Sequence, residues 1–298
     1  MKSLQAHEIP GHVTVTTGHG GLPAIQINTD WSLTEVYPHG AHVTGFQLKG
    51  RAPDTRTPAD QTSYPAPLLF LSAASEFHAD KPIRGGVPVI FPWFGPRDGM
   101  PAHGHARLTD WELLETAVLP DGSIRLHFRL PSNGCCTVDY FVTTGRSLGL
   151  EMVVTNTRET DYTFENCLHT YFQVGAVESI EITGLQGARY LDLLLAAEFT
   201  ESDDPIRIAA EIDRTYQNTR ATVEISDPVL ARTIRIRKSG SLSTVVWNPW
   251  TAKSKRMPDF GDEEYRQMVC VESGNIGENA ITLAPGQRSS MKVEIDCL

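Results

Sequence analysis

Two residues that are far apart in the chain, His169 and Glu272, carry side chains that can exchange protons near neutral pH. His169 lies in the apolar segment 167–172 (CLHTYF), and Glu272 lies in the apolar segment 268–275 (MVCVESGN). If both side chains reach one pocket, an imidazole and a carboxylate form an acid–base pair. Each residue alone also has an ordinary interpretation, as a hydrogen-bonded core histidine or as a solvated glutamate at a strand end. Evidence from other segments of the chain is therefore needed to distinguish a catalytic pair from two structural residues.

The chemistry open to such a pair includes the opening of a sugar ring. One group takes a proton from the anomeric hydroxyl while the other gives a proton to the ring oxygen. Segment 81–95 (KPIRGGVPVIFPWFG) has the composition of a site for such a ligand, because Arg84 precedes two glycines and is followed by prolines and aromatic residues. Glycines let the backbone approach a ligand closely or adopt positive φ, and sugar sites commonly combine an aromatic face with fixed polar groups. The alternative is a tight turn that leads into a proline-kinked edge strand.

A second histidine-containing segment follows at 103–107 (HGHAR). A His-x-His pair on one strand would direct both rings to the same face, which suits a metal. The next glutamate, Glu112, comes seven residues after His105, which is too far for a cupin-type ligand set. We therefore expect no metal at these residues. The interpretation that we prefer has His103 and Arg107 in contact with substrate and His105 packed nearby.

Two further segments have a functional and a structural interpretation. Asp213 lies in the strand-like segment 211–216 (EIDRTY), where it can serve a site or form a surface salt bridge. Segment 247–250 (WNPW) places two indoles around an Asn-Pro turn, which can be core packing or a wall near the site.

Short strands separated by turns dominate the chain. Apolar residues alternate with polar ones in many segments that are bounded by Gly, Pro, Asn or Asp, the pattern of half-buried strands in a sandwich or barrel. Residues 188–199 could form a helix or end a strand, residues 263–267 form one helical turn, and residues 51–67 form a surface loop. These features predict an all-β chain, mainly antiparallel, that forms a single domain over residues 1–298. The expected strands are 12–16, 24–28, 125–130, 148–154, 233–237, 243–247 and 291–296.

The composition is that of a globular protein. The chain has 298 residues, 40% of them hydrophobic and 21% charged, and its net charge of -10 argues against a nucleic-acid partner. It shows neither a membrane-spanning run nor a signal peptide, so we expect a cytoplasmic protein without a membrane partner. The five cysteines are dispersed without CxxC spacing, which predicts neither disulfides nor a zinc cluster. P-loop and GxGxxG patterns are absent, so the sequence gives no support for a nucleotide or flavin cofactor.

Five motifs in order resemble the glucose-6-phosphate 1-epimerase (hexose-6-phosphate mutarotase) branch of the aldose 1-epimerase superfamily. The resemblance covers residues from about 70 to 285. Ala102 and His105 depart from the common pattern, where glutamine and Phe or Leu are usual, and these departures concern sugar recognition rather than the acid–base pair. The motifs are 81–88 (KPIRGGVP), 103–107 (HGHAR), 168–172 (LHTYF), 247–250 (WNPW) and 269–272 (VCVE).

The resemblance implies a galactose-mutarotase-like β-supersandwich and an isomerase without a cofactor. It implies that His169 is the general acid toward the ring oxygen and that Glu272 is the general base on the anomeric hydroxyl. Arg84, Arg107 and Asp213 match substrate-binding positions, and His103 lies beside them. We expect a monomer whose substrate is a sugar phosphate.

We expect the phosphate to be held chiefly by Arg84 and secondarily by Arg107, since the overall charge is negative and an arginine fork binds phosphate oxygens. Three alternatives remain at this point: a non-catalytic sugar-binding β-sandwich, an aldose 1-epimerase for unphosphorylated hexose, and a metal-dependent cupin-like isomerase.

Overall fold

The computed structural model describes residues 2–50, 65–132 and 134–298. Strands are its main regular secondary structure, and every pairing between named strands is antiparallel. This confirms the predicted all-β class. Expected segments match strands to within a few residues, as for 148–154 and 291–296. The predicted loop 51–67 lies largely outside the described residues.

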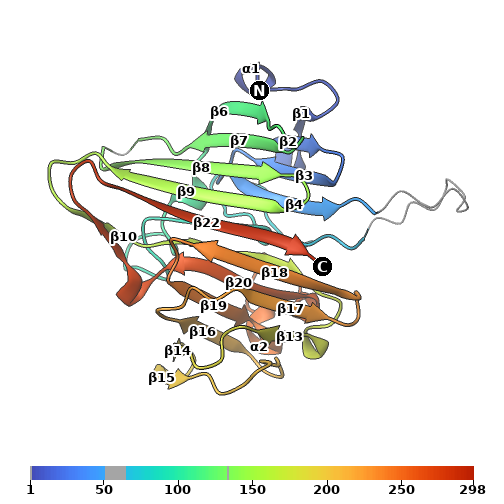
Figure 1. Ribbon diagram of the computed structural model, residues 1–298, viewed down its shortest axis with the longest axis vertical. Coiled ribbons are helices and arrows are strands. Elements are labelled where there is room, and N and C mark those ends of the chain that lie inside the picture. The colour runs from blue at the N-terminus through green and yellow to red at the C-terminus, as the bar shows by residue number, and fades with distance from the viewer. Residues whose placement is uncertain (1, 51–64, 133) are drawn as a thin grey trace, which may run out of the picture.

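Two eight-stranded sheets pack against each other. The outer sheet runs along the front of the molecule in Figure 1 and contains the longest strands. In spatial order its strands are β13 (Glu181–Thr183), β17 (Val223–Asp227), β18 (Arg232–Ser239), β22 (Arg288–Cys297), β9 (Leu148–Asn156), β8 (Cys136–Thr144), β7 (Ile124–Arg129) and β6 (Glu112–Val118).

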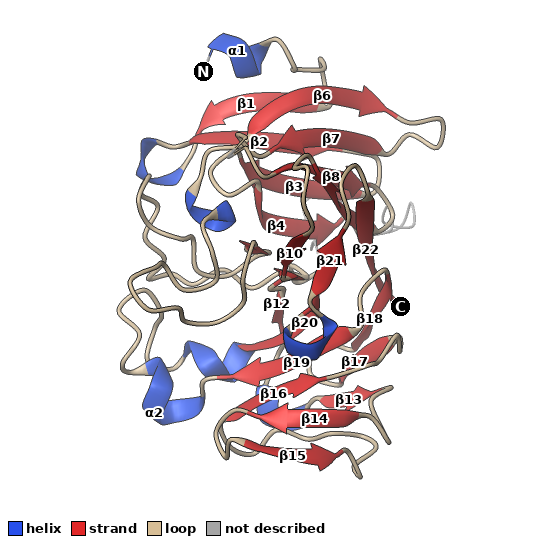
Figure 2. Cartoon of the chain, turned by 90° about the vertical axis from the view of Figure 1, so that its left-hand side faces the viewer, coloured by secondary structure: helices blue, strands red, loops and turns tan. Residues whose placement is uncertain are grey.

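The second sheet is called the site sheet below. Figure 2 shows helix α2 (Trp250–Ser254) and long loops on the side of this sheet that faces away from β18 and β22. The site sheet has the order β15 (Ala197–Thr200), β14 (Arg189–Asp192), β16 (Ile212–Tyr216), β19 (Ser243–Asn248), β20 (Met268–Asn275), β11 (Asn166–Leu168) and β5 (Val89–Ile90), and β12 (Tyr171–Gln173) also pairs with β20.

The remaining elements are smaller. A four-stranded N-terminal sheet and a two-stranded ribbon complete the strands, and the described helices are all short. These elements are β1 (Val13–Thr17), β2 (Pro23–Asn28), β3 (Ser32–Tyr37), β4 (His42–Leu48), β10 (Tyr162–Phe164), β21 (Ile281–Leu283), α1 (Lys2–Gln5), and the 3₁₀ turns η1 (His19–Gly21), η2 (Ala106–Leu108), η3 (Val177–Ser179), η4 (Glu264–Gln267) and η5 (Gly277–Asn279).

Strand β20 separates two apolar layers. Val269 and Val271 join the main core, which includes buried residues of β8, β9 and β22 from the outer sheet. Met268 and Cys270 belong to a second cluster on the opposite face, together with aromatic residues of the loops. Because side chains alternate between faces with a period of two, Glu272 shares the second face. Both faces of β20 are therefore buried, which explains why its sequence lacks polar alternation.

Segment 188–199 forms the β14–β15 hairpin, so the helical interpretation of it was wrong. The Asp192 carboxylate accepts hydrogen bonds from the backbone N–H groups of Leu194 and Leu195, at 3.0 and 3.1 Å. Such a turn competes with helix formation, and the pairing of β14 with β15 and β16 stabilises the extended form. The helical turn expected at 263–267 is confirmed as η4.

Candidate active site

The register of the site sheet brings His169 and Glu272 together. Strands β11 and β12 pair with the same strand, β20, with Leu168 opposite Ser273 and Tyr171 opposite Cys270. His169 lies in the short connection between β11 and β12, and Glu272 lies on the part of β20 that this connection crosses. Residues far apart in sequence are therefore fixed by backbone pairing rather than by flexible loops.

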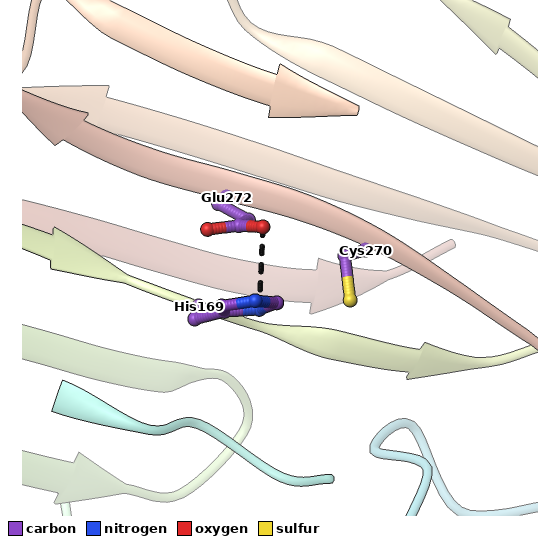
Figure 3. Close-up of side chains that lie close together, drawn as sticks. All are labelled: His169, Cys270 and Glu272. Atoms are coloured by element: carbon purple, nitrogen blue, oxygen red, sulfur yellow. Dashed lines mark ion pairs between the residues drawn. The ribbon is translucent and has the colours of Figure 1, made fainter. Parts of the chain in front are cut away.

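Figure 3 shows the pair with the Glu272 carboxylate above the face of the imidazole. The distance from His169 Nδ1 to Glu272 Oε1 is 3.2 Å. Nδ1 nevertheless has no hydrogen-bond partner in the described part of the chain, because the carboxylate lies off the direction of a ring N–H bond. The Cys167 thiol donates to Glu272 Oε2 at 3.4 Å. His169 is 7% exposed and Glu272 is 1% exposed, so protein atoms surround both groups.

Burial pushes both groups toward their uncharged forms. It raises the pKa of Glu272 well above its usual value, against a smaller opposing effect of the hydrogen bond from Cys167. It lowers the pKa of His169 well below its usual value, and His103, Arg107 and Arg84 lower it further. In the free protein both shifts therefore favour the neutral pair. Transfer of one proton from the carboxyl to the imidazole gives the ion-pair form with the same net charge.

Aromatic rings fix the imidazole. Tyr171 stacks on His169 with ring centroids 4.8 Å apart and an interplanar angle of 8°. Trp247 meets the His169 ring edge-on, with centroids 5.9 Å apart. Trp247 is directly opposite Cys270 on β20 and Asp213 on β16. Residues directly opposite one another share a face of a sheet, so Asp213, Trp247, Cys270 and Tyr171 form one row across four strands.

Arg84 approaches this row but is already bound. Its Nε and Nη2 contact Asp259 Oδ2 at 3.1 and 3.0 Å, and its Nη1 donates to the Tyr171 hydroxyl at 2.9 Å. Of the five guanidinium N–H groups, three are used and two remain. The Arg84 backbone precedes Gly85 and Gly86, which adopt φ of 111° and 58°. A Cβ at Gly86 would lie 2.2 Å from the carbonyl oxygen of Val43, so close backbone approach requires glycine here.

Arg107 is buried and has fewer partners. Its Nη2 donates to the carbonyl of Ala102 at 2.8 Å, while its Nε has no hydrogen-bond partner. Among the described residues it forms no ion pair within 4.0 Å. Burial and the nearby charge of Arg84 lower the pKa of Arg107 to about 10, so it remains charged at neutral pH. It is therefore a buried cation whose donors are mostly unused.

The premise that His103 and His105 lie on one strand was wrong. His103 and Gly104 have φ of 66° and 74°, which turns the chain sharply between the two rings. His103 packs against Phe94, while His105 packs against Trp93, each with centroids 4.8 Å apart. His103 Nδ1 accepts from the backbone of Gly95 at 3.2 Å, so the proton of the neutral ring is on Nε2.

His103 also lies near the acid–base pair. Its ring centroid is 5.8 Å from that of His169. Burial and the charges of Arg107 and Arg84 lower the pKa of His103 to about 3, so it is neutral and offers an N–H donor at this face. His105 does not contact His169 in this way, which agrees with a packing role.

Asp213 lies on the same face of the site sheet and also takes part in an ion pair, so both interpretations of its segment stay open. Its Oδ2 is 3.5 Å from Lys253 Nζ, which also lies 3.5 Å from Glu211 and 5.5 Å from the centroid of the Trp247 ring. Burial raises the pKa of Asp213, and Lys253 opposes this effect. The second indole, Trp250, packs on Tyr265 instead.

Two residues near the site had no assigned role in the sequence analysis. Asp259 is 13% exposed at its side chain and holds Arg84 from 175 positions away. Lys253 reaches Asp213 from α2. Neither residue belongs to a motif. Tyr171 was part of a motif, and its stacking on His169 and its bond to Arg84 are findings of the structure.

None of the described helices is long and apolar enough to cross a membrane. A model of the aldose 1-epimerase family matches residues 23–296. A protein from Cenchrus ciliaris named "Putative glucose-6-phosphate 1-epimerase" is 35% identical over 74% of this chain and 72% of its own length. A protein of the same name from Escherichia coli K12 is 32% identical over 82% of this chain and 83% of its own length.

Solved structures share the architecture. A crystal structure from Salmonella typhimurium, described as a "putative mutarotase", superposes with a TM-score of 0.85 at 26% identity and covers 98% of this chain and 95% of its own. A second structure, described as HI1317, has a TM-score of 0.80 at 24% identity and covers 98% of this chain and 97% of its own, which supports the fold alone.

Proposed function

Because the chain belongs to the aldose 1-epimerase family, we propose that it interconverts the α and β anomers of a hexose 6-phosphate, with glucose 6-phosphate as the preferred substrate. The observation that carries the proposal is the 3.2 Å approach of His169 and Glu272 on a buried face that also holds Arg84 and Arg107. The names of the relatives from Cenchrus ciliaris and Escherichia coli support the phosphorylated substrate.

The reaction needs two proton transfers and one bond rotation. Glu272, as carboxylate, takes the proton of the anomeric hydroxyl, while His169, as imidazolium, gives a proton to the ring oxygen. The C1–O5 bond breaks and leaves an aldehyde, which rotates about C1–C2. Closure on the other face of the aldehyde returns both protons. Each transfer contributes roughly 10²–10⁴-fold to the rate.

The phosphate of the substrate supports the charge state that this mechanism requires. The positive charges of Arg84 and Arg107 contribute to the low pKa of His169 in the free protein. A phosphate dianion beside these arginines offsets their charge, which raises the pKa of His169 and favours its imidazolium form. It also offsets the lowering of the Glu272 pKa by Arg107, whereas the charge of Arg84 lowers only the pKa of His169 among the two. The substrate thereby helps to prepare its own acid.

Arg107 is the better phosphate ligand on geometric grounds. Arg84 has two N–H groups left and is held by Asp259, whereas Arg107 uses one N–H group on Ala102 and forms no other hydrogen bond to described residues. A buried cation with unused donors is stabilised when an anion binds. We therefore assign the principal phosphate contact to Arg107 and a supporting one to Arg84, with His103 and Asp213 facing the sugar hydroxyls.

The test is mutarotation measured side by side on freshly dissolved single anomers of glucose 6-phosphate, galactose 6-phosphate and unphosphorylated glucose. We expect acceleration over the spontaneous rate, with the highest kcat/KM for glucose 6-phosphate. Binding without acceleration would instead identify a sugar-binding module. A preference for unphosphorylated glucose would identify an ordinary aldose 1-epimerase.

A further inference from the structure

We propose that His169, Cys270 and Glu272 also form a binding site for a thiophilic divalent cation, of which Zn²⁺ is the type case. Their ligand atoms are the imidazole nitrogen, the thiol sulfur and a carboxylate oxygen, and all lie within 4.8 Å of one another. Bound there, the cation would occupy the acid–base pair and exclude the sugar. The site is inhibitory, so it differs from a metal requirement for catalysis.

The spacing of the donor atoms is close to that of a zinc site. Zinc lies about 2.0–2.3 Å from nitrogen, oxygen and sulfur ligands in tetrahedral geometry, which places neighbouring ligand atoms about 3.3–3.8 Å apart. His169 Nδ1 and Glu272 Oε1 are 3.2 Å apart in the free protein. The thiol needs to approach by roughly 1 Å at most, which a rotation about its Cα–Cβ bond can supply.

The histidine offers a ring nitrogen that makes no hydrogen bond to the described residues. His169 Nδ1 is buried and has no hydrogen-bond partner in the described part of the chain. Figure 3 shows the Glu272 carboxylate over the face of the ring and the Cys270 thiol beside its edge. Nδ1 is therefore a buried polar atom that no described residue satisfies, and unsatisfied buried nitrogens are uncommon in folded proteins.

Strand β20 explains why the cysteine and glutamate act together. Cys270 and Glu272 are two residues apart on one strand, so they share a face. A nitrogen, sulfur and oxygen set favours zinc and similar cations over Mg²⁺ or Ca²⁺, which prefer oxygen ligands alone. Binding requires the thiolate and the carboxylate, so it releases to solvent any protons that these groups carry.

The binding test uses the full chain after treatment with chelator, with Co²⁺ as a spectroscopic probe and Zn²⁺ in calorimetry. We expect a thiolate-to-cobalt charge-transfer band in the near ultraviolet and one Zn²⁺ per chain. Cys270→Ser should remove the band and weaken Zn²⁺ binding at least tenfold, since even outer-shell changes cost about 10- to 100-fold. Mg²⁺ should not compete.

Matched variants separate this site from others. Cys136→Ser changes a buried cysteine of the outer sheet and should keep the band and the affinity. Cys270→Ala is the second variant if Cys270→Ser proves unstable, and thermal unfolding shows which variants fold. Absence of Zn²⁺ binding, or equal binding in wild type and both Cys270 variants, would overturn the proposal.

An activity measurement rests in addition on the proposed function. Zn²⁺ should inhibit mutarotation competitively with the sugar phosphate, and the ratio of the rates with and without Zn²⁺ should return to about one in Cys270→Ser, whatever the basal rate of that variant. If the wild type binds Zn²⁺ but does not catalyse mutarotation, the proposed function fails and the cation site stands. If the wild type catalyses mutarotation but does not bind Zn²⁺, the cation site fails and the proposed function stands.

Discussion

If Arg107 is the principal phosphate ligand, the single substitutions Arg107→Ala and Arg84→Ala should differ in their effects on activity and on stability. Arg107→Ala removes a cation with no carboxylate partner among the described residues, so it should act mainly on substrate. The loss of a charge-assisted hydrogen-bonded contact is about 1.5–3 kcal/mol. This converts to roughly a 10- to 100-fold fall in kcat/KM for the hexose 6-phosphate, with little change for the unphosphorylated hexose.

Arg84→Ala should affect folding as well as phosphate binding. It leaves the Asp259 carboxylate, which is 13% exposed, without the guanidinium that contacts it at 3.0 Å. Removing one partner of a buried ion pair destabilises a protein by about 3–5 kcal/mol, which corresponds to a fall in Tm on the order of 10 °C for a chain of this size. The phosphate-selective loss should again be roughly 10- to 100-fold or less, because only two donors are free.

The assay compares coupled mutarotation on phosphorylated and unphosphorylated hexose, together with thermal unfolding of each variant. The double variant Arg84→Ala/Asp259→Ala is the control, since it removes the unpaired carboxylate and should recover part of the lost stability. If Arg107→Ala lowers kcat/KM equally on both substrates, its assignment to the phosphate is wrong. If Arg84→Ala also lowers kcat/KM equally on both substrates and lowers Tm, the role of Arg84 is only to stabilise the Gly85–Gly86 turn.

The remaining predictions concern the acid–base pair, metals and the backbone. His169→Asn and Glu272→Gln should each lower kcat strongly without unfolding the chain, and the double variant should lose little more than the worse single one; near-wild-type turnover in either single variant would exclude that residue as a proton donor or acceptor. Mutarotation should continue at the same rate after exhaustive treatment with chelator. If the purified protein holds stoichiometric metal and loses activity when that metal is removed, the cupin-like isomerase would become the better interpretation. Gly86→Ala should lower the free energy of unfolding by more than Gly99→Ala, because both have positive φ but only the former places its Cβ against backbone. Gly99→Ala should lower the free energy of unfolding by about 1–2 kcal/mol, measured by chemical denaturation. Equal losses in the two variants would show that contact of a Cβ at position 86 with Val43 does not affect stability.

The strands were predictable because the outer sheet has one face in the core and the other toward solvent. That arrangement produces the period of two seen in segments such as 125–130 and 291–296. Segment 188–199 was less clear because its apolar run, rich in leucine and alanine, fits a helix equally well. Its extended form depends on pairing with β16, a contact that local sequence does not encode.

His169 and Glu272 were proposed as an acid–base pair from ordered motifs, whereas their surroundings depend on long-range contacts. No local pattern connects Asp259 with Arg84 or Lys253 with Asp213. The turn at His103 was missed because positive φ at a residue other than glycine leaves little trace in a sequence. Sequence analysis therefore selected two residues that the structure brings together, but not the residues that hold the arginines.

The position of Glu272 on a central strand has a consequence for how the site controls protons. Strand β20 pairs with β19 on one side and with β11 and β12 on the other, so its register cannot shift without moving Val271 out of the main core. This fixes the distance to His169 but also buries both groups, which favours their neutral forms. In the proposed mechanism, the phosphate of the substrate offsets the charges of Arg84 and Arg107 and so raises the pKa of His169, which favours the imidazolium that ring opening requires. An unphosphorylated hexose would meet the same geometry without that charge, so the preference for phosphate should appear in kcat as well as in KM.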